Sequence, residues 1–301
     1  MCIRDRQEVI DEALIGLVAA GHVLVEGVPG LGKTLLVKAL ARTIGGSFAR
    51  IQFTPDLMPS DVTGHTLYDP ASGKFATRKG PVFAHFVIAD EINRAPAKTQ
   101  AALLEVMQEA QVTIEGESHV LPQPFMVFAT QNPIEHEGTY PLPDAQLDRF
   151  LLNVRIGYPS AEDELALTRQ VTTATVGDRL SVDAVQPVLD PGRVAQLQAM
   201  AAALTVDDAV LGYAVRLARH TRDNPNLSRG AGPRASIAMI RCARARALMA
   251  GRAFATPDDV KSVALAVLRH RVAVAPELEI EGRDADSVLT ELLAQVEAPR
   301  L

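Results

Sequence analysis

Near its start the chain reads Gly27-Val28-Pro29-Gly30-Leu31-Gly32-Lys33-Thr34, which matches the phosphate-binding pattern G-x-x-x-x-G-K-[ST]. Glycines in such a loop let backbone N–H groups turn toward an anion, and a helix that begins there directs its positive end at that anion. Lys33 would reach the β- and γ-phosphates of a nucleotide, the Thr34 hydroxyl would bind Mg2+, and Leu35 would add a further nucleotide contact. An apolar run over residues 22–26 precedes the loop and an amphipathic stretch over 33–44 follows it, which is the context that this motif requires.

Composition narrows the class of protein. The chain has 301 residues, 48% of them hydrophobic, which is enough for a sizeable core. Its formal net charge of −6 argues against nucleic acid as the main partner. Cys2 and Cys242 are too few for a disulfide framework, and we find neither a signal peptide nor an apolar run long enough to span a bilayer. We therefore expect a cytoplasmic protein.

Hydrophobic runs predict the fold of the first half of the chain. Five short runs alternate with helical or looped stretches, at residues 22–26, 48–52, 86–89, 125–130 and 150–155. Continuous hydrophobicity is typical of strands buried on both faces, which indicates an α/β fold with a mostly parallel sheet flanked by helices. Two polar-faced hairpins, at residues 64–77 and 111–121, are expected to project from this core.

Helix signals dominate after Pro159. Ser160 and Asp163 match a capping box, while Asp190-Pro191 and Thr256-Pro257 are typical of helix starts. We therefore predict an ATP-binding core over residues 1–158, followed over residues 159–301 by a helical linker and a small all-α domain.

An acidic pair, Asp90-Glu91, follows the apolar run 86–89. It would lie at the carboxyl end of a buried strand, where open α/β sheets bind ligands. Asp90 would hold Mg2+ through its water shell, and Glu91 would polarise the attacking water. The alternative is a strand end that meets solvent, but the phosphate-binding loop favours the catalytic interpretation.

Three further polar residues are candidates for the same reaction. Asn132 follows another apolar run and could orient water or contact the γ-phosphate, although Asn-Pro is also a common turn. Arg149 precedes the run 150–155 and could stabilise transition-state charge, or form a surface ion pair with Asp148 or Asp144. Arg234 opens an expected helix, where a cation is unfavourable unless an anion such as a phosphate faces it; the alternative is a solvated side chain.

A basic segment stands out in the second half. Residues 212–252 contain nine arginines and one acid, Asp223. We hypothesise that this segment docks on the acidic surface of a neighbouring copy, and we consider nucleic acid a weaker alternative because the whole chain is acidic.

Together these motifs resemble the MoxR-type AAA+ ATPases, over nearly the whole chain from about Gln7. The resemblance is carried by residues 27–34, 51–61, 90–96, 129–133, 147–150 and 233–236. It implies that Asn132 is the sensor 1 residue, that Arg149 is an arginine finger acting on a neighbour's ATP, and that Arg234 is the sensor 2 residue of the lid domain. Residues 1–6 do not fit the family pattern, so we expect a truncated or foreign start.

The resemblance also implies the function. It predicts a Mg2+-dependent ATPase that forms a homo-oligomer, a hexameric ring with both hairpins facing the central pore. ATP hydrolysis would drive chaperone-like remodelling, maturation or activation of a client protein complex, with a von Willebrand factor A domain protein as partner.

Three alternatives remain open at the level of sequence. A chelatase-type motor subunit for metal insertion would share the mechanism. A nucleic-acid motor is disfavoured by the acidic charge and by the absence of a basic, aromatic surface on the hairpins. A scaffold that binds ATP without hydrolysing it is disfavoured by Glu91 and Arg149.

Overall fold

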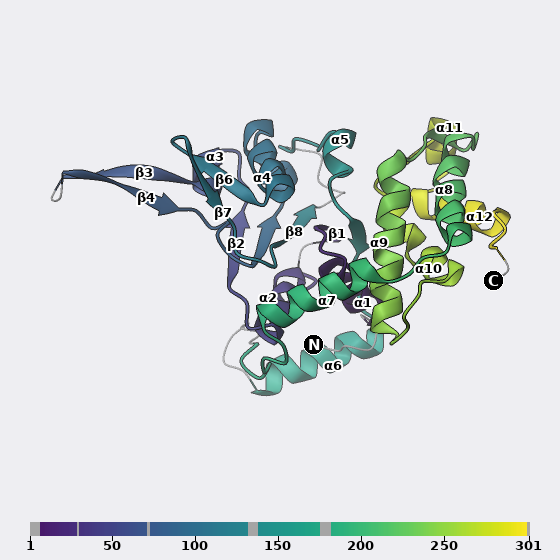
Figure 1. The fold of residues 1–301 in the computed structure, drawn as a ribbon, viewed down its shortest axis with the longest axis horizontal. Coiled ribbons are helices and arrows are strands. Elements are labelled where there is room, and N and C mark those ends of the chain that lie inside the picture. Colours follow the sequence, from purple (N-terminus) through teal and green to yellow (C-terminus); the bar gives the residue numbers. More distant parts are fainter. Residues whose placement is uncertain (1–6, 29, 71–72, 132–137, 175–181, 300–301) are drawn as a thin grey trace. The chain divides into compact units, whose positions relative to one another are not determined.

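The structure, a computed structural model, describes residues 7–28, 30–70, 73–131, 138–174 and 182–299. These residues form two compact units that interleave along the chain (Figure 1). The first unit contains residues up to Asp11, with His22–Leu142 and Val154–Ala195. The second, the helical unit, contains Glu12–Gly21, Pro143–Asn153 and Gln196–Leu301.

A five-stranded sheet forms the core of the first unit. Its strands are β1 (Val23–Glu26), β2 (Phe48–Gln52), β5 (Phe86–Asp90), β8 (Met126–Gln131) and β9 (Leu152–Arg155), in the order β2-β5-β8-β1-β9. The pairs β2–β5, β5–β8 and β1–β8 are parallel. Every residue of β5 is buried, as its continuous hydrophobicity requires. The predicted parallel sheet is confirmed.

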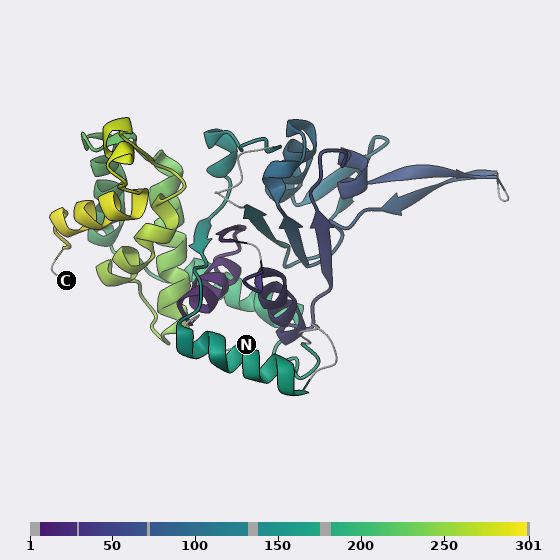
Figure 2. The same cartoon turned by 180° about the vertical axis from the view of Figure 1, so that it is seen from behind.

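Helices and two hairpins complete the first unit. The helices include α2 (Lys33–Thr43), α3 (Pro59–Thr63), α4 (Ala97–Glu109) and α6 (Ala161–Ala174), and α1 (Gln7–Val18) begins in this unit. The first hairpin is the ribbon β3 (Gly64–Asp69) and β4 (Lys74–Lys79), and the second pairs β6 (Gln111–Ile114) with β7 (Glu117–Val120). In both views the β3–β4 ribbon extends beyond the sheet (Figures 1 and 2). Both predicted hairpin insertions are therefore present.

The helical unit has a core of small aliphatic side chains. Its elements are α5 (Asp144–Leu147), most of α7 (Pro191–Ala203), α8 (Asp208–Arg222), α9 (Pro233–Met249), α10 (Pro257–Leu268), α11 (Pro276–Ile280) and α12 (Ala285–Gln295), with a short pair β10 (Leu227–Arg229) and β11 (Ala273–Val274). Helix α9 buries five alanines, which lets α8 and α10 approach it closely. Among the helices described in either unit, none is long and apolar enough to cross a bilayer.

Asp259 anchors the start of α10. Its carboxylate accepts hydrogen bonds from the backbone N (2.8 Å) and Oγ1 (2.9 Å) of Thr256, and from both terminal nitrogens of Arg252 at 2.7 and 2.5 Å. Burial alone would raise the pKa of Asp259, but the hydrogen bonds from Arg252 and Thr256 outweigh burial and lower the pKa below its usual 3.8. Ionised Asp259 therefore stabilises the folded unit.

We expect Asp259→Asn to reduce the free energy of unfolding by about 2 kcal/mol at neutral pH, because it removes hydrogen bonds to a charged acceptor. A lowered folded-state pKa gives stability that is present above the unfolded pKa and lost as pH falls through the folded pKa. The variant should therefore lose less stability than the parent below about pH 4 in thermal unfolding. Asp258→Asn, at the exposed neighbouring position, is the control. An acid dependence identical to that of the parent would contradict this role.

Candidate nucleotide-binding site

The phosphate-binding loop connects the carboxyl end of β1 to the first turn of α2. Gly30 and Gly32 have φ angles of 84° and 78°, in the left-handed region that favours glycine. Gly27 is required for a different reason: a Cβ at this position would lie 2.5 Å from the carbonyl oxygen of Ile156. The sequence therefore folds here into a loop that ends at the positive end of a helix, as the motif predicts. Pro29 lies outside the described residues.

Lys33 lies between the loop and the acidic pair. Its Nζ donates a hydrogen bond of 2.7 Å to the carbonyl oxygen of Gly27. Burial lowers the pKa of Lys33, while the negative charges of Asp90 and Glu91 oppose that shift. A partly desolvated ammonium group close to two carboxylates can bind the phosphate oxygens of a nucleotide.

Asp90 is a buried carboxylate, 7% exposed, that joins three elements at the end of the sheet. Its Oδ1 accepts a hydrogen bond of 3.0 Å from Thr130 Oγ1 at the end of β8. Its Oδ2 accepts from Thr34 Oγ1 (3.4 Å) in α2 and from Arg50 Nε (2.8 Å) in β2. The structure thus brings the two expected Mg2+ ligands, Thr34 and Asp90, into contact.

Glu91 has an unusual backbone conformation directly after β5. Its φ of 56° and ψ of 50° are left-handed, which is uncommon for a residue other than glycine and occurs often at functional sites. The backbone N–H donates to Thr130 Oγ1 at 2.9 Å. The side-chain Oε2 accepts from Gln52 Nε2 at 3.0 Å and pairs with Arg94 Nε at 3.1 Å. The carboxylate is therefore fixed at the carboxyl edge of the sheet.

Sequence reasoning missed Arg50 and Gln52. The two residues are two positions apart in β2, so they share one face, and β2 pairs with β5 so that Gln52 lies opposite Asp90. Arg50 Nη2 also lies 2.7 Å from Asp90 Oδ2 and 3.0 Å from Gln52 Oε1. The alternation of polar residues in Phe48–Gln52 was a possible signal, but only with knowledge of which strand lies beside β5.

The donor set fits Mg2+. A hydroxyl and a carboxylate oxygen meet at the end of the phosphate-binding loop, and hard cations prefer such oxygen ligands. In the described ranges we find no group of three or more His, Cys, Asp or Glu side chains that could hold a metal ion. Mg2+ in nucleotide sites typically uses one or two protein ligands and completes its shell with water and phosphate oxygens, so Thr34 and Asp90 are sufficient.

The other three candidates are placed differently. Asn132 lies outside the described residues, and its neighbour Gln131 donates a hydrogen bond of 2.7 Å from Nε2 to Glu26 Oε1. Arg149 and Arg234 belong to the helical unit. Arg149 follows α5 and is half-buried, and no described residue forms a hydrogen bond or ion pair with its guanidinium group. Arg234, in the first turn of α9, places Nη1 at 3.7 Å from Asp148 Oδ2.

The two acids considered as surface partners of Arg149 have other partners. Asp148 pairs with Arg271 at 2.8 Å, and Asp144 pairs with Arg229. Within the described residues, neither acid therefore forms the surface ion pair with Arg149 that the sequence left open.

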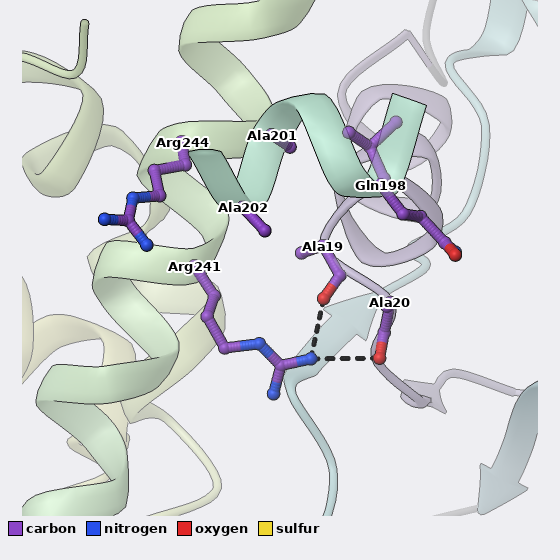
Figure 3. Close-up of a pocket in the computed structure, with 8 residues that line it drawn as sticks. Ala19, Ala20, Gln198, Ala201, Ala202, Arg241 and Arg244 are labelled. Carbon is purple, nitrogen blue, oxygen red and sulfur yellow. Dashed lines mark hydrogen bonds between the residues drawn. The ribbon is translucent and has the colours of Figure 1, made fainter. Parts of the chain in front are cut away.

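The arginine-rich segment has many partners inside its own unit. Arg222 donates to the carbonyl oxygen of Ala231 at 2.8 Å, and Arg229 and Arg252 pair with aspartates. Arg241 Nη2 donates to the carbonyl oxygens of Ala19 and Ala20, 2.6 and 2.9 Å away (Figure 3). These contacts give much of the segment a structural role, so its charge does not by itself require a neighbouring acidic surface.

A cavity of about 300 Å3 lies in the helical unit beside Arg241. It is lined by Val18, Ala19, Ala20, Gln198, Ala201, Ala202, Arg241 and Arg244 (Figure 3). None of the residues expected to bind nucleotide lines it, so this cavity is separate from the site described above.

The β3–β4 ribbon corrects one expectation about the hairpins. Tyr68 and Phe75 are 56% and 75% exposed, and their ring centroids lie 5.2 Å apart. Lys74, Arg78 and Lys79 are exposed on the same ribbon. The ribbon therefore does carry exposed aromatic and basic side chains. Cross-strand pairing brings the two rings together, and strand alternation places Lys79 on the face of Phe75 and Lys74 and Arg78 on the other face.

Comparisons with known proteins agree with this geometry. Residues 22–152 match the ATPase family associated with various cellular activities (AAA), and residues 219–292 match the AAA lid domain. The chain is 45% identical to the protein YeaC of Bacillus subtilis over 95% of its own length and 88% of that protein. It is 43% identical to Chaperone MoxR1 of Mycobacterium tuberculosis, over 98% and 79% of the two chains.

A solved structure supports the same assignment. The crystal structure of a protein from Cytophaga hutchinsonii, which is named as an ATPase, superposes with a TM-score of 0.88 at 40% identity and covers 98% of this chain and 91% of that one. The phosphate-binding loop, the acidic pair, the helical lid and these relatives all lead to one assignment: the chain belongs to the MoxR family of AAA+ ATPases.

Proposed function

We propose that this protein is a Mg2+-dependent ATPase that converts ATP and water to ADP and phosphate and uses the reaction for chaperone-like remodelling, maturation or activation of protein complexes. The proposal is carried by the convergence of Thr34, Asp90 and Glu91 at the end of the phosphate-binding loop. The M. tuberculosis relative is named a chaperone, which supports the proposal that ATP hydrolysis drives remodelling of other proteins. We place the protein in the cytoplasm.

In the proposed mechanism, several positively charged groups share the negative charge that develops on the transferred phosphoryl group. Glu91 orients water and accepts its proton, while Lys33 binds the phosphate oxygens. Thr34 and Asp90 would hold Mg2+, which would supply positive charge against the phosphates of the bound nucleotide. Arg149 of a neighbouring protomer and Arg234 of the same protomer add positive charge at the transferred phosphoryl group, and Asn132 orients the water.

The need for a neighbour's Arg149 leads to an oligomer, which we propose to be a hexameric ring. Its client is a protein complex, and its partner a von Willebrand factor A domain protein. The deciding experiment measures ATP turnover per protomer over a wide range of protein concentration. A steep rise with concentration is the expected result, because sites would be completed between protomers. A measurable rate that does not change with concentration would contradict the proposal that Arg149 completes the site of a neighbouring protomer. No turnover at any concentration would contradict the proposal that the chain hydrolyses ATP by itself.

Arg50 gives a test of the Mg2+ site that does not depend on turnover. Removing its guanidinium takes away the cation that hydrogen-bonds the buried Asp90 carboxylate, so Arg50→Met should lower the melting temperature in EDTA with ADP. Mg2+ would then replace the missing charge, and the rise in melting temperature on adding Mg2+ should be larger in the variant than in the parent.

Arg50→Lys keeps a positive charge and is the matched control, with a smaller change expected in both measurements. If Mg2+ raises the melting temperature of Arg50→Met and of the parent by the same amount, Asp90 is not part of the metal site.

The exposed ribbon favours a second candidate, a nucleic-acid motor. Aromatic rings beside basic side chains can stack on bases and bind the phosphate backbone. In that case single-stranded DNA or RNA would stimulate ATP turnover, and replacing both Tyr68 and Phe75 by serine would abolish the stimulation. Unchanged turnover with nucleic acid would remove this candidate.

A further inference from the structure

Arg271 is a buried cation for which the proposed reaction has no use. It follows α10 in the helical unit, and its side chain is 3% exposed. Burying a charge is costly unless the group is paired and its hydrogen-bonding atoms are satisfied. The partners of this guanidinium therefore indicate what it does.

Nearly all partners of Arg271 flank one residue, Arg149. Its Nε donates to Asp148 Oδ1 at 2.8 Å. Its terminal nitrogens donate to the carbonyl oxygens of Phe150 (2.5 Å), Leu151 (3.2 Å) and Asp148 (3.5 Å), and also to that of Val267. The carbonyl groups on both sides of Arg149 are thus held by one planar group, whose fixed fork suits several acceptors at once.

The two residues before Arg271 hold the same stretch. Arg269 Nη1 donates to the carbonyl oxygen of Asn153 at 3.0 Å, and its Nε pairs with Asp286 at the same distance. His270 Nε2 lies 3.2 Å from the carbonyl oxygen of Phe150. Burial, with the charge of Arg271, holds the pKa of His270 well below its usual value, so the ring is neutral and donates through Nε2. We call Arg269, His270 and Arg271 the clamp.

The clamp contrasts with the residue that it surrounds. The backbone around Arg149 is fixed by the clamp, whereas no described residue pairs with its guanidinium group. A fixed backbone limits where such a side chain can reach, so only its own rotamers remain to be ordered when an anion arrives. Asp148 also lies 3.7 Å from Arg234 Nη1, so one carboxylate contacts both Arg234 and Arg271.

We propose that the clamp, acting with Asp148, is the positioning element for Arg149. It fixes residues 148–151 to the helical unit and thereby sets where the Arg149 guanidinium meets the nucleotide of a neighbouring protomer. The inference rests on the proposed function, in which Arg149 acts between protomers. It assigns to Arg271 a role in a neighbour's active site, in addition to its contribution to its own fold.

The test compares two kinds of protomer. The giving protomer supplies Arg149 to its neighbour, and the receiving protomer carries the active site in which that arginine acts. Glu91→Gln protomers cannot hydrolyse ATP but can give Arg149, while Arg149→Ala protomers cannot give it but keep their own Glu91. A mixture of the two should regain turnover. Arg271→Lys is then added either to the giving protomer or to the receiving one. We expect a loss of about 10- to 100-fold when the change is in the giving protomer, because a small misplacement of a catalytic group costs this much, and little loss when it is in the receiving protomer.

Equal losses in the two arrangements would mean a merely structural role and would overturn the proposal. Arg246→Lys, an exposed arginine on α9, is the matched control and should change neither mixture. If Arg271→Lys does not fold, Asp148→Asn replaces it, because it removes the same ion pair from the other side. If the mixture without any clamp variant fails to regain turnover, the role of Arg149 between protomers is wrong, and the clamp proposal falls with it.

Discussion

Glu91→Gln will bind ATP about as well as the parent, while its turnover falls by about 10²- to 10⁴-fold. Glutamine has nearly the size of glutamate, and its side-chain oxygen can still accept the hydrogen bond from Gln52 Nε2. Neither residue is glycine, so the left-handed backbone at this position costs about the same in both proteins. The variant therefore loses the proton acceptor and the ion pair with Arg94, which is partly exposed and contributes little stability.

Two measurements check this result: titration with a fluorescent ATP analogue for binding, and phosphate release for turnover. Glu117→Gln, at an exposed position of β7, is the matched control and should leave both unchanged. Turnover near that of the parent would show that another group activates the water, and loss of binding would show that Glu91 supports the fold of the site.

The second large effect is expected for Arg149→Ala, whose turnover should fall by about 10³-fold or more at protein concentrations that favour assembly. The reason is that the guanidinium adds positive charge where the transferred phosphoryl group develops negative charge. Binding of ATP should be nearly unchanged, because Lys33 and the phosphate-binding loop are intact. Turnover is measured by phosphate release, and assembly by light scattering on the same samples.

Arg246→Ala removes an exposed arginine from the same unit and is the control for the change in net charge. Normal turnover in Arg149→Ala would disprove its catalytic role. Loss of assembly together with turnover would instead make Arg149 an interface residue.

The fold was predictable where the signal is local. Five mostly apolar runs marked the strands within one or two residues. The reason is clearest for β5 and β8, which are buried on both faces and are therefore apolar almost throughout. The phosphate-binding loop was predictable because glycine, lysine and threonine at fixed spacing have few other uses. The start of α10 was predictable from Thr256-Pro257 for the same reason, since a cap residue followed by proline is a local signal.

The missed parts depend on contacts between distant segments. Arg50 meets Asp90 only because β2 lies next to β5, and no local pattern gives the order of strands in a sheet. Arg271 meets Asp148 across 123 positions of the chain, and a buried arginine cannot be told from an exposed one by its letter. The exposed pair of Tyr68 and Phe75 likewise required the register of the ribbon.

The interleaving of the two units also sets rules for recombination between relatives. A chimera made by a single crossover near residue 158 would join the Asp148 segment of one parent to the Arg271 of the other. Compatible chimeras should instead exchange residues 143–153 and 196–299 as one block, which requires more than one crossover. Sequence exchange within the family should therefore keep these two stretches linked, although more than a hundred positions separate Asp148 from Arg271.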